Sequence, residues 1–263
     1  MINVIYFLIF ILGAVIGSFL NVVICRLPEK KSVVRDRSAC PHCKAIIKPI
    51  DLIPIVSFFI LGGKCRQCRK NISWQYPLVE FITGLIFVFL AYYHNIIVDF
   101  NNLAFYRDLV FACGLLVVFM TDLLYYYIFD AVVLPMMFFA GIVNFFLLAN
   151  STNYLLTLGH LALAAVVGGG FFYIQYVLSK GKWVGGGDIY LGIMMGLMLS
   201  WPNILVALFI AYVGGALVSL GLMIFRKKGL KSIVPFAVFL SAATFIVLLY
   251  GTQILNWYLG LLY

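Results

Sequence analysis

The sequence predicts an all-α membrane protein, a polytopic bundle of about eight transmembrane helices with one small polar insert. Hydrophobic residues make up 65% of the 263-residue chain, charged residues make up 10%, and the mean hydropathy is +1.10. A water-soluble globule of this composition would have to expose most of its apolar side chains. The apolar runs are continuous and lack the period-two alternation of a membrane β-barrel, so helices are expected rather than strands.

Several apolar stretches approach the length of about 20 residues that a helix needs to cross a bilayer. They cover residues 3–24, 78–94, 106–127, 130–149, 155–178, 188–200, 203–225 and 233–258, and the stretch at 188–200 is the shortest. The chain is therefore divided into a first transmembrane helix at 1–25, a polar insert at 26–77 and a transmembrane domain at 78–263.

Basic residues sort to one side of the membrane. If the first span starts on the outer side of the membrane, 17 of the 18 lysines and arginines lie in segments on the inner side, and Arg107 lies on the outer side. The inside segments contain Arg26 through Lys70, then Lys180 and Lys182, then Arg226, Lys227, Lys228 and Lys231. The positive-inside rule therefore places the insert in the cytoplasm. The net charge of +9 then faces anionic lipid headgroups, and no nucleic-acid partner is needed to explain it.

The insert contains two Cys-x-x-Cys pairs, Cys40 with Cys43 and Cys65 with Cys68. Four thiolates at this spacing can close a tetrahedral shell around Zn²⁺, and the metal would supply folding energy that so small a segment cannot obtain from burial. With four protein ligands no position stays open for a catalytic water, so we interpret the site as structural. His42 is interpreted as a spacer. Two disulfides are the alternative, which a reducing cytoplasm disfavours.

Two acidic residues lie at the cytoplasmic ends of apolar segments. Asp122 is near the end of the third span, and Asp188 follows Gly185, Gly186 and Gly187 at the start of the sixth. A carboxylate at membrane depth costs about 2.5 to 3.5 kcal/mol, so such groups usually line an aqueous cavity. Two facing carboxylates would share a proton, one acting as base and one as acid, as in aspartic proteases. The glycines would let a substrate strand approach the carboxylate.

Other interpretations of the acidic residues remain open. Asp130, at the start of the fourth span, is interpreted as a helix cap, whereas Glu80 could line the same cavity as the aspartates. A proton-coupled transporter would also place carboxylates at depth, although transporter sites lie near the bilayer midplane. A nonenzymatic scaffold that docks through the metal module would leave the two aspartates without a purpose.

Six motifs follow one another along the chain in the order of a known family. They are Gly17 to Pro28 with Asn21 and Arg26, the cysteine pairs Cys40 to Cys68, Tyr76-Pro77 to Glu80, Asp122 with Ile128-Phe129-Asp130, Gly185 to Asp188, and Val234-Pro235-Phe236. With these motifs the chain resembles the type 4 prepilin leader peptidases, which are bacterial Gly-x-Gly-Asp membrane aspartyl proteases. It departs from them at Phe129, where proline is usual, at Tyr190, where lysine is common, and at Gln75, which replaces a frequent arginine.

The resemblance implies a reaction and a place. Asp122 and Asp188 would be catalytic, removing the basic leader of type IV prepilins or pseudopilins at the cytoplasmic face of the bacterial inner (plasma) membrane. Relatives with the zinc-bearing insert generally also methylate the new N-terminus with S-adenosylmethionine. No glycine-rich Rossmann turn marks a site for that cofactor, and the matched motifs offer Asn21, Arg26 and Glu80. For Asn21 an interhelical hydrogen bond, and for Arg26 interfacial snorkelling, are the favoured alternatives.

Overall fold

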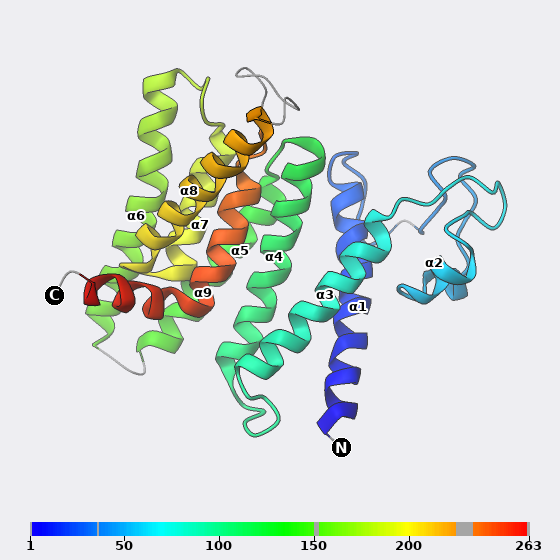
Figure 1. Ribbon diagram of the computed structural model, residues 1–263, viewed down its shortest axis with the longest axis horizontal. Coiled ribbons are helices and arrows are strands. Elements are labelled where there is room, and N and C mark those ends of the chain that lie inside the picture. Colours follow the sequence, from blue (N-terminus) through cyan, green and yellow to red (C-terminus); the bar gives the residue numbers. More distant parts are fainter. Residues whose placement is uncertain (1, 36, 150–152, 225–233, 262–263) are drawn as a thin grey trace. The chain divides into compact units, whose positions relative to one another are not determined.

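A computed structural model describes residues 2–35, 37–149, 153–224 and 234–261, and within these residues the chain is all-helical (Figure 1). The α-helices are α1 (Ile2–Arg26), α2 (Val56–Ile60), α3 (Gln75–Tyr93), α4 (Leu103–Tyr125), α5 (Asp130–Ala149), α6 (Tyr154–Ser179), α7 (Gly186–Leu199), α8 (Asn203–Ile224) and α9 (Ala237–Gly260). A 3₁₀ turn covers Pro49–Leu52, and the described residues form isolated β-bridges but no strand. The predicted fold class is confirmed.

Seven of these helices are long and apolar enough to cross a membrane, so the protein is a multi-pass membrane protein. The expected span at 188–200 is not among them: this stretch forms α7, a shorter apolar helix of 14 residues. At a rise of about 1.5 Å per residue α7 is about 21 Å long, short of the hydrocarbon core. Ser200, whose φ is +62°, ends the helix before Pro202.

The chain folds as two compact units, Met1–Leu109 and Val110–Tyr263, and the division falls inside α4. In the first unit α1 packs along α3. Glycine allows this close approach: a Cβ on Gly13 would lie 2.8 Å from the Gly84 Cα, and a Cβ on Gly17 would lie 2.8 Å from the Glu80 Cα. Larger residues at these positions would push the two helices apart.

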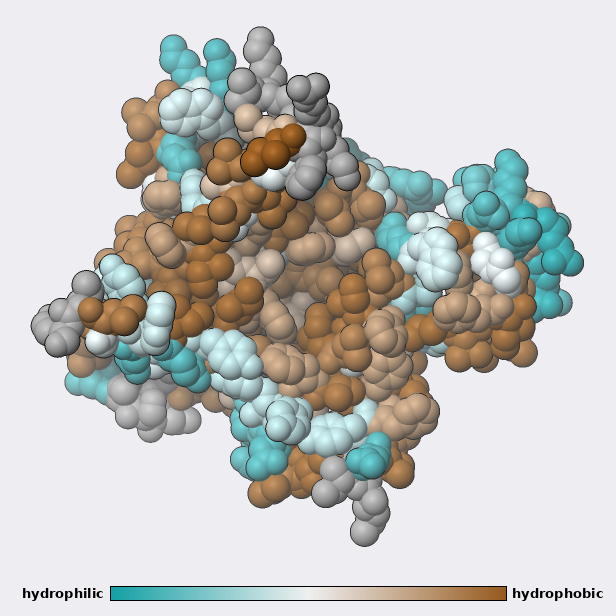
Figure 2. Space-filling model, viewed as in Figure 1, coloured by the Kyte–Doolittle hydropathy of each residue, from teal (hydrophilic) through white to brown (hydrophobic). Residues whose placement is uncertain are grey.

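The insert between α1 and α3 has almost no apolar core of its own. Among its described residues from 27 to 74 only Cys40 and Phe58 are buried, at 5% and 8% exposure. Phe58 packs against Trp74 with ring centroids 4.7 Å apart. On the surface of this segment hydrophilic residues gather on one side and apolar residues on the other (Figure 2).

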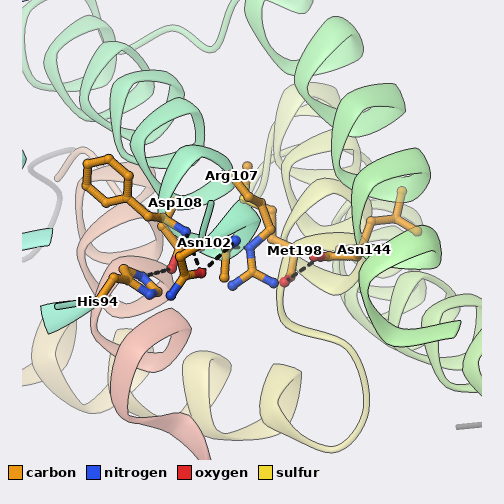
Figure 3. Close-up of polar contacts among 9 residues, drawn as sticks. His94, Asn102, Arg107, Asp108, Asn144 and Met198 are labelled. Atoms are coloured by element: carbon orange, nitrogen blue, oxygen red, sulfur yellow. Dashed lines mark hydrogen bonds and ion pairs between the residues drawn. The ribbon is translucent and has the colours of Figure 1, made fainter. Parts of the chain in front are cut away.

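In the second unit the short helix α7 lies among α5, α6 and α9. Its Met194 and Met195 side chains are fully buried, while apolar side chains of the surrounding helices form much of the exposed surface (Figure 2). The carboxamide Nδ2 of Asn144 donates to the carbonyl oxygens of Leu197 and Met198 at 2.7 and 2.9 Å. This side chain of α5 therefore satisfies carbonyls that the end of α7 leaves without helical partners (Figure 3).

Candidate active site and metal site

Asp122 lies at the C-terminal end of α4 and is 6% exposed. Its Oδ2 accepts a hydrogen bond of 3.3 Å from the backbone N–H of Val238, and the N–H of Ala237 also donates to this carboxylate. Both donors belong to the first turn of α9. A helix N-terminus has free N–H groups and a partial positive charge, so it stabilises an anionic side chain.

Asp188 is the third residue of α7 and is half-buried. Its Oδ2 accepts a hydrogen bond of 2.9 Å from the backbone N–H of Gly185, the residue that precedes the helix. An acidic side chain at this helix position caps the N-terminus. Both aspartates are thus held by main-chain N–H groups at helix starts.

The two carboxylates belong to one region of the second unit. Asp122 and Asp188 are close enough for the charge on one to act on the other. Ile128, in the link that follows α4, packs on Gly187, where an added Cβ would lie 3.0 Å from the Ile128 Cβ. Gly187 therefore lets the chain after Asp122 approach the start of α7. Two acids so arranged can divide the roles of proton donor and proton acceptor around one water molecule.

Sequence reasoning missed the neighbours of this pair. Tyr212 of α8 is close enough to Asp188 to feel its charge, and its hydroxyl donates to the Oε1 of Gln175 at 3.0 Å. The Tyr212 ring packs on Phe236 with ring centroids 4.8 Å apart. Phe236 immediately precedes α9, which supplies the donors to Asp122. A proline followed by an apolar run, as at Pro235, was the available signal for this helix start.

Two of the departures from the family pattern have a local structural account. Where a proline is usual, the carbonyl of Phe129 accepts from the N–H of Val132 at 2.9 Å and of Val133 at 3.2 Å, so it caps α5. The turn after α4 is made instead by Tyr126, whose φ is +55°. Tyr190 lies exposed on α7.

The other expected residues lie in the first unit. The carboxylate Oε2 of Glu80 accepts from the backbone N–H of Ile55 at 2.7 Å. Asn21 makes the expected interhelical bond, donating from Nδ2 to the Tyr76 carbonyl at 3.0 Å. Arg26 donates to the carbonyls of Ser32 and Val33 at 2.8 and 3.2 Å. Because Glu80 and the aspartates belong to different units, a cavity shared by them stays a prediction.

The four cysteines of the insert form one cluster. The Sγ atoms of Cys40, Cys43, Cys65 and Cys68 all lie within 4.8 Å of one another, and none is joined in a disulfide. A zinc ion with Zn–S bonds of about 2.3 Å places its sulfur ligands about 3.8 Å apart. The Sγ atoms of Cys40 and Cys68 are 3.8 Å apart. The cluster could therefore hold a metal ion, and its dimensions fit zinc.

The backbone builds both halves of this cluster in the same way. The N–H of Cys40 donates to the carbonyl of Ala45, and the N–H of Cys65 donates to that of Lys70, both at 2.9 Å. Lys44 and Arg69, which follow the second cysteine of each pair, both have a φ of +58°. An isolated bridge closes each turn, between Ala39 and Ile46 and between Lys64 and Asn71. Each Cys-x-x-Cys pair is therefore a preformed turn that presents two thiols on one side.

The clustered thiols do not hold their protons equally. The backbone N–H of Cys43 lowers the pKa of Cys40 to about 6, although burial opposes this shift. The Lys70 N–H lowers the pKa of Cys68, but burial and the neighbouring thiols outweigh it and raise the value to about 11. A metal ion must displace the remaining protons, so its affinity rises with pH.

Comparison with known proteins identifies relatives along almost the whole chain. Residues 11–94 match the model of the bacterial peptidase A24 N-terminal domain, and residues 109–220 match that of the type IV leader peptidase family. These two matches lie close to the two compact units of the fold. No solved structure matches the chain.

Curated relatives cover nearly the full length. The chain is 29% identical to the prepilin leader peptidase/N-methyltransferase of Bacillus subtilis, over 96% of this chain and 97% of the relative. It is 30% identical to the protein of the same name from Pseudomonas aeruginosa, over 95% and 91%, and 31% identical to that from Stutzerimonas stutzeri, over 95% and 92%. With this identity, coverage and order of domains, the chain belongs to the type IV leader peptidase family.

Proposed function

We propose that this protein is a membrane aspartyl endopeptidase that removes the basic leader of type IV prepilins or pseudopilins. The placement of Asp122 and Asp188 carries the proposal: both lie at one end of the second unit, each held by backbone N–H groups at a helix start. Relatives that this chain covers over more than nine tenths of their length bear the name prepilin leader peptidase/N-methyltransferase.

The chemistry follows from two carboxylates that are close enough for the charge of Asp122 to act on Asp188. One aspartate takes a proton from a water molecule, which attacks the carbonyl carbon of the scissile peptide bond. The other aspartate, protonated beforehand, gives its proton to the leaving amine as the C–N bond breaks. The N–H groups of Val238 and Gly185 hold the two carboxylates in place during this exchange, so little reorganisation is needed.

The orientation of the chain supports cleavage at the cytoplasmic face. The positive-inside rule places the insert and its lysines and arginines in the cytoplasm, beside anionic headgroups of the bacterial inner membrane. The basic cluster Arg226 to Lys231, which contributes to this assignment, lies outside the residues that the structure describes. A substrate whose apolar helix is in the bilayer would then present its leader at the cytoplasmic ends of α4 and α7.

We further propose that Zn²⁺ is held by Cys40, Cys43, Cys65 and Cys68 in a structural role, and that the protein also methylates the new N-terminus. When bound, S-adenosylmethionine supplies the methyl group as a sulfonium-activated electrophile.

The test is cleavage of a purified prepilin in detergent by Asp122→Asn and Asp188→Asn variants. Asparagine keeps the size and the acceptor oxygen for Val238 or Gly185 but cannot exchange protons. Each substitution should lower the rate of leader removal by at least about 1,000-fold, because the two acids act as a unit.

The matched control is Asp130→Asn, an acidic residue exposed at the start of α5. This variant should cleave at the wild-type rate, and all three proteins should keep their zinc content and helicity. Substantial cleavage by a folded Asp122→Asn or Asp188→Asn protein would exclude the aspartyl mechanism.

A further inference from the structure

The first unit pairs two of its shielded carboxylates with cations. Asp108, which is 1% exposed, contacts the His94 Nε2 at 2.8 Å and the Arg107 Nε at 2.7 Å (Figure 3). Asp51 makes two bonds to the guanidinium of Arg66, at 2.9 and 2.6 Å. In both cases a positive group of the chain itself offsets the cost of removing the carboxylate from water.

Glu80 differs from both. It is 7% exposed, yet its carboxylate is held by neutral donors alone, the backbone N–H of Ile55 and the hydroxyl of Ser18. Among the described residues of the first unit, no lysine, arginine or histidine nitrogen lies within ion-pair distance of it. A shielded carboxylate without a cation retains a strong preference for a positive partner.

A buried acceptor without any donor lies one helical turn away from Glu80. The Oδ1 of Asn21 is buried and has no hydrogen-bond partner, while the Nδ2 of the same side chain donates to the Tyr76 carbonyl. The Tyr76 carbonyl can accept a hydrogen bond only from the NH₂ group of the Asn21 carboxamide. This bond therefore identifies Nδ2 as the donor, and the oxygen Oδ1 is the atom without a partner. Asn21 is three residues after Ser18 on α1, and Tyr76 is four residues before Glu80 on α3. Both acceptors therefore lie along one seam between the two helices.

The backbone that contacts Glu80 is also unusual. Ile55 has φ +62° and ψ −56°, and the N–H of Val56 donates across it to the Pro54 carbonyl at 2.6 Å. This is a γ-turn with positive φ, a strained conformation for a β-branched residue. The bond to Glu80 holds this turn, so the insert that carries the cysteines is fastened to α3 at the same place.

We propose that Asn21 and Glu80 form a binding site for a small organic cation of the methylation reaction. The chemistry is shared by two sources, the sulfonium of the methyl donor and the ammonium group at the new N-terminus of the processed substrate. Either would place its positive charge beside the Glu80 carboxylate, and an ammonium or amino N–H would satisfy the Asn21 Oδ1. This inference rests on the proposed methyltransferase function and assigns it to the first unit.

The experiment is calorimetric titration of the full chain, zinc-loaded in detergent, with S-adenosylmethionine and with S-adenosylhomocysteine, its uncharged thioether. Wild-type protein should bind the sulfonium about tenfold more tightly, as expected for a charge beside a shielded carboxylate. Glu80→Gln keeps an acceptor for Ile55 and Ser18 but removes the charge. This variant should lose that tenfold preference and bind the two ligands equally. Glu29→Gln, the same change at a residue 58% exposed, should behave as wild type.

A second titration tests whether the site binds the ammonium group of the processed N-terminus. A short peptide with the sequence of the processed N-terminus is compared with its N-acetylated form, and preference for the free amine that disappears in Glu80→Gln assigns the site to the ammonium group. The proposal is overturned if Glu80→Gln keeps full discrimination by charge, or if wild-type protein discriminates neither pair. Leader cleavage by the wild-type protein is measured separately, so a failed peptidase assay and a failed cation titration remain distinguishable.

Discussion

The insert of the first unit and the helices of the second unit reach order by different means. In the insert of the first unit, Cys40 and Phe58 are the buried side chains among the described residues from 27 to 74, and four thiols form the centre. In the second unit α7 is enclosed by other helices, and glycines let the backbones touch: a Cβ on Gly192 would lie 2.4 Å from the carbonyl oxygen of Gly168.

The difference follows from the solvent around each region. A short polar segment in water cannot bury enough apolar surface to offset its loss of chain entropy, so a metal is needed. Helices in a bilayer gain no hydrophobic energy from meeting one another, and they associate where small residues permit close van der Waals contact. The insert should therefore fail in response to a change that the second unit tolerates, and the second unit in response to a change that the insert tolerates.

Metal removal should have the largest effect. Stripping zinc with a chelator, or replacing Cys68 by serine, should unfold the insert, because binding of a structural zinc contributes about 10 kcal/mol to folding. Hydrogen–deuterium exchange should show loss of protection within residues 37–74 and unchanged protection in α5 to α8. Cys113→Ser, a thiol of the second unit outside the cluster, is the control. Protection of the insert that survives complete metal removal would contradict a metal-dependent fold.

A single methyl group should instead damage the second unit. A Cβ on Gly168 would lie 2.2 Å from the carbonyl oxygen of Gly192, and a backbone atom cannot move aside as a side chain can. Gly168→Ala should therefore destabilise the α6–α7 contact by about 3 kcal/mol, measured as thermal unfolding in detergent. It should leave zinc content unchanged.

Gly170 supplies the matched control two residues along the same helix. A Cβ there meets nothing within 4 Å, so Gly170→Ala should be neutral or stabilise α6 by about 0.5 kcal/mol through helix propensity. Equal destabilisation by the two substitutions would show that the α6–α7 contact does not depend on close approach at Gly168.

Much of this organisation could be predicted from sequence, because its causes are local. Span length is fixed by bilayer thickness, so the predicted stretch at 130–149 coincides with α5. The Cys-x-x-Cys spacing similarly predicts a four-thiol cluster that the structure contains. The prediction differs at α7, which was counted as a span although the helix is too short to cross the membrane; hydropathy does not show that Asn144 of another helix would cap such a helix.

The contacts that shape the candidate sites depend on distant parts of the chain. Nothing near Asp122 in sequence indicates that Val238 would donate to it, and nothing near Glu80 indicates the strained turn at Ile55. The acidic residues themselves could be found because a carboxylate in an apolar segment is rare. Their partners could not, because a backbone N–H carries no sequence signature.

The smallest effect is expected from the ion pair in the insert. Arg66, half-exposed, donates to Asp51 and lowers the pKa of that carboxyl. A lowered pKa means that the pair stabilises the fold above the carboxyl's ordinary pKa and that this contribution disappears as the pH falls through the lowered value. Because water screens the half-exposed guanidinium of Arg66, Arg66→Ala should lower the thermal midpoint at pH 7 by only about 1 °C.

The same variant should also raise the pKa of Asp51 towards its ordinary value, which a carboxyl-detected NMR titration of the full chain can follow. Arg66→Lys should give an intermediate pKa, because an ammonium keeps the charge but cannot make both bonds. A fall in thermal midpoint as large as that caused by zinc removal would mean that the pair is as necessary to the insert as the metal. The small expected change therefore tests whether the insert depends on its metal site. In a segment with so little core, only the four-thiol site should be indispensable.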